Sequence, residues 1–351
     1  MLRFDDIFID YTRLGRKIPK EKYLQKGKHI IIDQGQNDIA GYSNEEDGIF
    51  SDIPVIIFGD HTRIFKLIKS PFFLGADGTK ILKAKISNMS YDYLYYYLKY
   101  KKIPNTGYNR HFKWLKELTF EIKDFNEQEK ISTVLNKVSK ILEMKKQQLS
   151  EFDKLVKFQF LKIFGDPILN EKNWKTEKLF KVAPITQYIG KFDEKIWLLN
   201  LDMIEANTGK IIKYNYTNLE NIPLSTYKFS EENVLYSKLR PYLNKVVIPN
   251  NRGYVTSEML PLKPNPLLLN RYFFAYLLRC ETFVDFIKNK VSGTKMPRVS
   301  MEELKQFDCI LPPIELQNKF ADFVKQVDKS KVILGKALKS LSFRLNYYYM
   351  L

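Results

Sequence analysis

A heptad pattern that occurs twice constrains the fold of this chain most strongly. Apolar residues recur at alternating steps of four and three from Ile131 onward, and again from Phe320 onward. Such spacing is typical of a helix that packs along one seam against another helix. The second run repeats the first at a constant offset, so that position 131 corresponds to 320 and position 159 corresponds to 348. We therefore predict two long helices that arose by internal duplication.

The seam residues define the predicted helix packing. Lys145 and Gln159 interrupt the first run, and Lys331 interrupts the second. The side chains expected to pack between the helices are Ile131, Leu135, Val138, Leu142, Leu149, Phe152, Val156, Phe320, Val324, Val327, Leu334, Leu338, Leu341 and Leu345. Asn126 is the expected N-cap of the first helix. Each helix of some 35 residues would span roughly 50 Å, or about one to one and a half turns of B-DNA.

The repeat extends upstream of the helices. The alternating segment 118–122 precedes the first helix, and 307–311 precedes the second at the same offset. A dimerisation helix would explain the heptads alone, but it would not explain a strand and a module at constant spacing before each one. Duplication is the better interpretation. Two such helices can bury their seams against each other as an antiparallel pair, which would relate the halves by a pseudo-two-fold axis.

The expected fold is α+β, with two mixed modules joined by two heptad helices. The predicted boundaries are 1–122 and 166–312 for the modules, and 123–165 and 313–351 for the helices. Short β-type runs separated by turn residues predict strands at 29–32, 54–58, 195–201, 233–237 and 245–248. Helices are predicted at 91–100 and 268–290.

The charge of the chain indicates a polyanionic partner. The 57 Lys and Arg residues exceed the 40 Asp and Glu residues, which gives a net charge of +17. Binding to phosphates releases counterions, so double-stranded DNA fits this charge; a generally lysine-rich composition is the alternative. Two cysteines exclude a disulfide framework. The absence of a long apolar run and of a secretory pattern predicts a cytoplasmic protein without a membrane span.

The loops of the modules carry the candidate DNA contacts. Arg and Lys can recognise guanine, and Asn can recognise adenine, so polar loops with these residues suit base recognition. For each residue taken singly, a solvated surface charge remains the alternative. The residues predicted to contact DNA are His61, Arg63, Lys80, Asn109, Arg110, His111, Lys238, Arg240, Lys245, Arg252, Lys295 and Arg298.

The motifs of common enzymes are missing from the sequence. The Gly-Lys pairs lack the Ser or Thr of a Walker A motif, and no G-x-G-x-x-G occurs. No (N/D)-P-P-(Y/F) run of an amino-methyltransferase is present, and the three histidines are too scattered for a metal site. Glu143-Met144-Lys145 matches a nuclease-like E-x-K pattern, but it lies on a heptad helix. The prediction is therefore a non-catalytic binding protein without bound metal.

With these motifs in view, the chain resembles the specificity subunit of type I restriction–modification systems. The resemblance is carried by Phe-x-Cys-x-Leu-Pro-Pro-Ile-Glu-x-Gln (307–317) before the second helix and a degenerate copy at 120–128. It is also carried by Ile-Phe-Gly-Asp-His-Thr-Arg (57–63), Phe-Phe-Leu-Gly-Ala-Asp-Gly (72–78) and Asn-Val-Leu-Tyr-Ser-Lys-Leu-Arg-Pro (233–241). At the first helix, Lys-Asp-Phe-Asn replaces the usual Pro-Pro.

This resemblance implies a part in DNA methylation and host defence. Each module would be a target recognition domain that binds one half of a bipartite DNA site. The helices would set the gap and dock two methyltransferase subunits, which would hold S-adenosylmethionine and methylate adenine N6. Restriction–translocase subunits would supply ATP- and Mg²⁺-dependent cleavage, and this chain would bind no cofactor itself.

Two other functions are open from the sequence. One is a nuclease or methylase with an unfamiliar active site. The other is a basic adaptor that contacts DNA phosphates without sequence preference. The target sequence and the gap do not follow from the residues.

Overall fold

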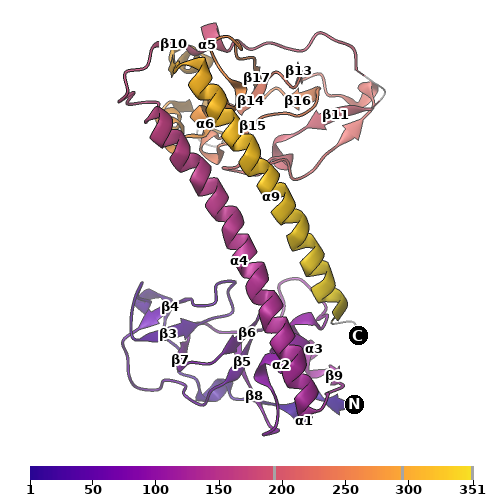
Figure 1. Ribbon diagram of the computed structural model, residues 1–351. Coiled ribbons are helices and arrows are strands. Elements are labelled where there is room, and N and C mark those ends of the chain that lie inside the picture. Colours follow the sequence, from indigo (N-terminus) through magenta and orange to yellow (C-terminus); the bar gives the residue numbers. More distant parts are fainter. Residues whose placement is uncertain (193–194, 294–295, 349–351) are drawn as a thin grey trace. The chain divides into compact units, whose positions relative to one another are not determined.

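The fold consists of two compact units, as seen in a computed structural model that describes residues 1–192, 195–293 and 296–348. Unit 1 comprises Met1–Lys146 together with Lys336–Leu351, and unit 2 comprises Gln147–Gly335. Two long helices, α4 (Phe125–Phe164) and α9 (Ile314–Tyr348), contribute a segment to each unit (Figure 1). The helices in the described ranges are all too short or too polar to cross a bilayer.

Unit 1 is built on a four-stranded antiparallel sheet and a smaller mixed sheet. The strand orders are β2-β8-β5-β6 and β4-β3-β7, and β3 runs parallel to β7. Its elements before α4 are β1 (Leu2–Arg3), α1 (Phe4–Ile7), β2 (Phe8–Asp10), β3 (His29–Ile32), β4 (Gly41–Ser43), β5 (Val55–Gly59), β6 (Phe65–Ile68), β7 (Phe72–Leu74), β8 (Thr79–Ala84), α2 (Tyr91–Tyr100), α3 (Phe112–Lys116) and β9 (Thr119–Phe120). Strand β5 is buried along its whole length, as expected for a central strand with a continuous apolar run.

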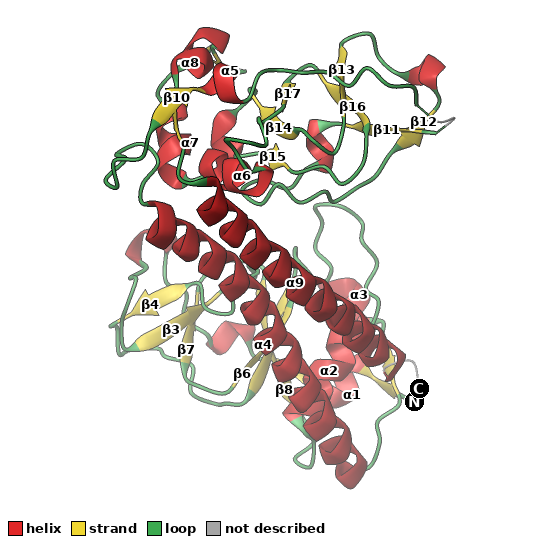
Figure 2. Cartoon of the chain, turned by 45° about the horizontal axis from the view of Figure 1, so that its top comes forward, coloured by secondary structure: helices red, strands yellow, loops and turns green. Residues whose placement is uncertain are grey.

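Unit 2 repeats this plan with different loops. Its sheets have the orders β15-β14-β17 and β12-β11-β16-β13, and β11 runs parallel to β16. The elements are β10 (Thr176–Lys178), α5 (Leu179–Val182), β11 (Ile196–Leu199), β12 (Tyr216–Thr217), β13 (Thr226–Phe229), β14 (Val234–Ser237), β15 (Val246–Val247), β16 (Gly253–Thr256), β17 (Met259–Leu262), α6 (Arg271–Arg279), α7 (Glu281–Lys288), β18 (Val291–Ser292), β19 (Arg298–Val299), α8 (Met301–Gln306) and β20 (Asp308–Ile310). Figure 2 shows the strands of each unit between short helices.

Most strand pairings of the two units correspond, although β2 of unit 1 and β13 of unit 2 have no counterpart strand in the other unit. Hairpin β5–β6 corresponds to β14–β15, and the pairing of β5 with β8 corresponds to that of β14 with β17. In each unit a short antiparallel ribbon joins the first strand to the strand before the long helix, as β1 with β9 and β10 with β20. The α+β class predicted from the sequence is confirmed.

A buried glutamine fastens each long helix to its unit in the same way. Gln128 accepts from the Ser90 N–H at 2.9 Å and donates to the Lys123 carbonyl at 2.8 Å. Gln317 accepts from the Asn270 N–H at 2.8 Å and donates to the carbonyls of Leu268 and Pro312 at 3.0 and 2.7 Å. Because buried polar groups must be paired, these side chains fix where α2 and α6 begin against the long helices.

Within each unit, the segments of α4 and α9 pack against each other and run antiparallel. In unit 1, Leu135 and Leu345 are buried in one cluster with Tyr96 of α2. In unit 2, the ring of Phe320 lies 5.6 Å from that of Phe160 and 5.5 Å from that of Phe164. All fourteen side chains predicted to pack in the seam are buried or half-buried.

Three local expectations were wrong. Asp124 caps α4 in place of Asn126, because its carboxylate accepts from the Glu127 N–H at 2.9 Å. The helix expected over 268–290 is divided at Cys280, whose ψ is 138°. There the amide of Asn244 donates to the Arg279 carbonyl at 3.0 Å, and the chain turns so that α7 buries Phe283.

The third difference lies at the C-terminal end of α4. Phe160 and Phe164 are buried, whereas Ile163, which the heptad selects, is only half-buried. These two phenylalanines lie in the main core of unit 2 with Phe273 of α6. The seam changes register here because α4 packs against the module core and α9 at the same time.

Candidate nucleic-acid interface

Three loops of unit 1 are joined at Asp60, which follows β5. The Asp60 N–H donates to the Gly78 carbonyl at 2.7 Å, and its own carbonyl accepts from the His111 N–H at 2.8 Å. Its carboxylate also accepts from the Phe112 N–H at 2.7 Å. The β5–β6 turn, the β7–β8 turn and the loop before α3 therefore form one fixed surface, which we call the loop brace of unit 1.

Unit 2 contains the same brace at Lys238, which follows β14. The Lys238 N–H donates to the Glu258 carbonyl at 3.0 Å, and its carbonyl accepts from the Val299 N–H at 2.9 Å. The Arg240 N–H adds a bond to the Pro297 carbonyl at 2.8 Å. Loops in different parts of the sequence are thus assembled alike in both units.

An arginine with left-handed backbone conformation lies in the central turn of each brace. Arg63 has φ of 61° and Arg240 has φ of 47°. This conformation costs a residue other than glycine on the order of 1–3 kcal/mol, and such strain is concentrated at functional sites. Arg240 is exposed and Arg63 is half-buried. Both residues were predicted to contact DNA, and the brace places them in equivalent turns.

Some of the other residues predicted to contact DNA are exposed, and others bond to side chains of the same unit. Asn109 and Arg110 are exposed on the loop before α3. Lys80 lies 3.3 Å from the Asp10 carboxylate and 4.9 Å from the centre of the Phe112 ring. Arg252 donates to the Tyr188 hydroxyl at 3.0 Å. His61 and Lys238 are half-buried at the braces, and Lys295 lies outside the described residues.

His111 requires a correction. It is fully buried, and its Nδ1 lies 3.0 Å from the Asp60 carbonyl oxygen. The ring therefore lies inside the brace of unit 1 and holds it together, and DNA cannot reach it in this conformation. The sequence placed His111 on a polar loop, but Arg110 before it is the exposed residue, and Phe112 after it begins α3.

Two further predicted contacts have partners within unit 2. The Lys245 ammonium donates to the Leu201 carbonyl at 2.6 Å, and burial lowers its pKa. Arg298 donates to the Glu258 carboxylate through Nε and Nη2 at 2.8–3.1 Å. Each hydrogen bond raises the pKa of Arg298 and lowers that of Glu258. Lys245 and Arg298 therefore both have bonding partners within unit 2, and neither is an unpaired cation.

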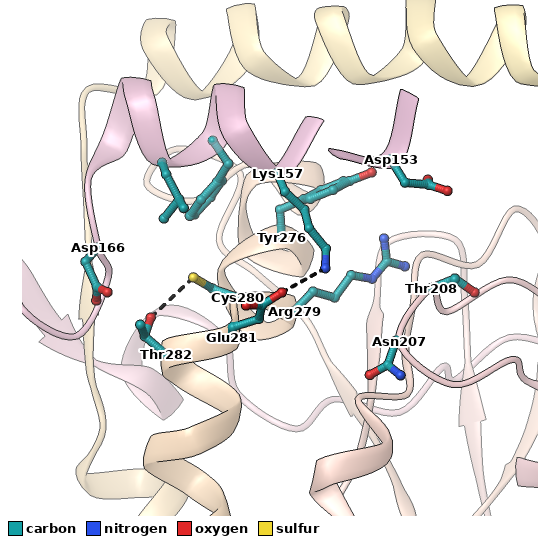
Figure 3. A pocket seen from close by; sticks show the side chains of 12 residues that line it. Asp153, Lys157, Asp166, Asn207, Thr208, Tyr276, Arg279, Cys280, Glu281 and Thr282 are labelled. Atoms are coloured by element: carbon teal, nitrogen blue, oxygen red, sulfur yellow. Dashed lines mark hydrogen bonds and ion pairs between the residues drawn. The ribbon is translucent and has the colours of Figure 1, made fainter. Parts of the chain in front are cut away.

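A separate pocket of unit 2 lies beside α4, α6 and α7. Its volume is about 340 Å³, and Tyr276, Arg279 and Cys280 line one side (Figure 3). Lys157 pairs with Glu281 at 3.1 Å, and the half-buried Arg279 guanidinium donates to the Val246 carbonyl at 2.7 Å. The charged groups are thus largely satisfied by one another, which makes this pocket a poor match for a phosphate. In the described ranges, no group of three or more His, Cys, Asp and Glu side chains could hold a metal ion.

Comparison with known proteins supports the resemblance found in the sequence. Residues 171–341 match the family described as type I restriction modification DNA specificity domain. The chain is therefore similar to the specificity subunits of type I restriction–modification systems.

The curated relatives are specificity subunits of this type. The EcoDI specificity subunit of Escherichia coli is 27% identical over 143 residues, which cover 41% of this chain and 32% of that protein. The MjaIX specificity subunit of Methanocaldococcus jannaschii is 21% identical over 236 residues, which cover 60% of this chain and 54% of that protein. The chain thus spans about a third to a half of the length of the curated relatives it matches.

Two solved structures from type I restriction–modification systems have a similar fold. The S subunit of a type I restriction-modification system from M. genitalium superposes with a TM-score of 0.61 at 17% identity, over 99% of this chain and 94% of that one. A chain from a study of complex assembly and conformational transition in a type I R-M system gives 0.53 at 12% identity, over 97% and 96%. At these identities the likeness concerns the fold alone.

Sequence reasoning missed three residues of the loop braces. Gln34 accepts from the His61 N–H at 3.1 Å, and Glu258 pairs with Arg298. Tyr108 stacks on His61 with ring centres 5.1 Å apart. The only signal for Tyr108 was Gly107, whose positive φ of 80° turns the chain immediately before it.

Proposed function

We propose that this chain is the DNA-specificity subunit of a type I restriction–modification complex. Each unit would bind one half of a split DNA site through its loop brace, without catalysing a reaction. The observation that carries the proposal is the pair of equivalent braces, each with a strained arginine in the same turn. The net charge of +17 supplies the attraction to phosphates, and the brace loops supply the side chains for base recognition.

A selection experiment tests this function. Randomised duplexes are bound by the full chain together with its methyltransferase subunits at physiological salt, and the bound fraction is sequenced. We expect a motif of two short sequences separated by a fixed number of unspecified base pairs. Substitution of Arg240 should relax specificity in one half only. Recovery of unsplit or random sequences contradicts the proposal.

A second proposal is that α4 and α9 set the gap between the half-sites. Both helices are continuous through the boundary between the units, so each helix connects the two units without a break. Removal of one heptad from both helices should shorten the gap and leave each half-sequence intact. If the gap is unchanged in the selected sequences, the helices do not act as a spacer.

We also propose that the outer faces of the long helices bind the methyltransferase subunits. Several large apolar side chains are exposed there, including Ile141 and Met144 in the unit 1 segment of α4 and Phe158 in the unit 2 segment. Exposed apolar side chains of this size commonly mark protein contacts. S-adenosylmethionine, ATP and Mg²⁺ would be bound by the partner subunits. Double substitution of Ile141 and Met144 by Ser should weaken co-purification of the methyltransferase.

The alternative is a basic adaptor that contacts phosphates only. The same net charge favours it, because charge alone gives binding without sequence preference. The selection experiment separates the two: an adaptor yields random sequences and an affinity that depends steeply on salt.

A further inference from the structure

Tyr108 is the most exposed aromatic side chain of the unit 1 loop brace. The residue is 91% exposed and lies on the loop between α2 and α3. An aromatic ring that remains in water loses the stabilisation of about 1.5–3 kcal/mol that its burial would give. The ring is therefore an apolar surface among polar loops, next to the exposed Arg110.

The ring of Tyr108 is held in place on its other face. It stacks on the imidazole of His61 with ring centres 5.1 Å apart and an angle of 13° between the ring planes. His61 packs in turn against Gly78, where a Cβ atom would lie 2.9 Å from the imidazole and where φ is +80°. A side chain fixed in this way has little rotational entropy left to lose when a ligand covers its free face.

The loop that carries Tyr108 is closed by its own hydrogen bonds and anchored to the brace at its C-terminal end. The Asn109 side chain donates to the Thr106 carbonyl at 2.5 Å, and the Asn109 N–H donates to the Gly107 carbonyl at 2.9 Å. The buried His111 anchors the following turn to Asp60. Tyr108 is therefore presented from a rigid loop, which is the property that a recognition side chain requires.

We infer that Tyr108 is a specificity-determining residue whose free ring face packs against an apolar group of the DNA half-site read by unit 1. The inference rests on the proposed function. Duplex DNA offers such a group in two forms, the 5-methyl of thymine in the major groove or the face of an unstacked base. The base face matches the exposed ring in size, whereas the methyl would cover only part of it. Arg110 beside it would attract phosphate, which is the same for every DNA sequence.

The binding test uses the full chain with its methyltransferase subunits and the split duplex selected by the wild-type complex. Tyr108→Ala should lower affinity about ten-fold or more, the scale of one aromatic contact. The slope of affinity against salt should stay unchanged, since no charge is lost, whereas Arg110→Ala should reduce that slope by about one. Tyr108→Phe keeps the ring and should bind within about two-fold of wild type.

Two modified duplexes identify the DNA group. Replacement of a thymine by uracil in the half-site of unit 1 removes one methyl and should weaken wild type about four-fold if the methyl is the partner. A mismatch in that half-site, which lowers the cost of unstacking, should strengthen wild type if a base face is the partner. In either case Tyr108→Ala should lose the response. Tyr216→Ala, on an exposed residue of the edge strand β12, serves as the matched control and should bind as wild type.

The outcomes separate this inference from the proposed function. If the wild-type complex selects no split site, the proposed function fails and this inference fails with it. If wild type selects a split site and Tyr108→Ala binds it equally well, only the inference is overturned. It is also overturned if Tyr108→Ala binds weakly but responds to both modified duplexes as wild type does, because the ring then acts on its own loop. An unchanged melting temperature of Tyr108→Ala is expected for a residue this exposed.

Discussion

The two loop braces share a backbone pattern but differ in how side chains fasten them. In unit 1 the imidazole of His111 is fully buried and lies 3.0 Å from the Asp60 carbonyl oxygen. In unit 2 the corresponding loop is held by the Arg298–Glu258 ion pair, and the Arg298 side chain is 42% exposed. One brace therefore depends on a buried ring and the other on a pair of charges in contact with solvent.

This difference shows which features of the module are structural and which are free to vary. The backbone bonds at Asp60 and Lys238 are equivalent in geometry, so they define how loops are assembled. The side chains around them are unrelated, and they include an aromatic stack in unit 1 and an ion pair in unit 2. A constant frame with interchangeable side chains is what the proposed function requires, because each unit would then bind a different half-site.

The largest expected effect concerns the glutamines that fasten the long helices. Gln317 makes three hydrogen bonds and is fully buried, whereas Gln128 makes two and is 2% exposed. We expect Gln317→Ala to destabilise unit 2 by about 3 kcal/mol and Gln128→Ala to destabilise unit 1 by about 2 kcal/mol, because buried partners are left unpaired. Urea unfolding of the full chain measures both.

Hydrogen exchange locates these losses. The amides of Ser90 and Asn270 donate to the two glutamines, so each should exchange faster only in the variant of its own unit. Gln148→Ala, on an exposed position of α4, is the matched control and should change stability by less than about 0.5 kcal/mol. If Gln128→Ala lowers the free energy of unfolding more than Gln317→Ala does, the number of buried hydrogen bonds does not decide how firmly each helix is fastened.

An intermediate effect is expected at His111. His111→Ala removes a buried ring and its bond to Asp60, so unit 1 should lose about 2 kcal/mol and the loop 105–112 should exchange faster. Arg298→Ala should cost unit 2 clearly less, because exposed ion pairs contribute little. Thermal unfolding of both variants tests the order. Equal losses would mean that the ion pair fastens its brace as firmly as the buried ring does.

Much of the fold followed from periodicity in the sequence. The helix predicted at 91–100 and the strand at 29–32 have those bounds in the structure, since both patterns are local. The break at Cys280 was not predictable, because it depends on the Asn244 side chain, which is distant in sequence. The end of the seam at Phe160 and Phe164 likewise depends on the core of unit 2.

The site was predictable at the level of loops but not of side chains. The sequence selected the turns at Arg63 and Arg240, since Gly, Asn and Pro mark turns locally. Within the loop before α3 it selected His111, which is buried, and passed over Tyr108, which is exposed. Which of two nearby residues points inward is decided by the bond to Asp60, and that contact spans 51 positions of the chain.

The smallest expected effect is a dependence of unit 2 stability on pH. Hydrogen bonds from Arg298 hold the pKa of Glu258 below its ordinary value, against the opposing effect of burial. A carboxylate with a lowered pKa stabilises the folded state fully above its unfolded pKa of about 4.3, and this contribution is lost as pH falls through the lower folded value. Glu258→Gln should therefore flatten the acid side of the stability profile.

The size of this effect is limited by solvent. Because the pair is partly open to solvent, the melting temperatures of wild type and Glu258→Gln should diverge by no more than about 2 °C between neutral and acidic pH. Arg298→Ala should flatten the profile to the same extent, since the pKa shift depends on that guanidinium. The variant that carries both substitutions should have the same pH profile of stability as either single variant. A Glu258→Gln profile parallel to that of wild type would show that the ion pair does not stabilise the brace, and that the backbone bonds at Lys238 hold it alone.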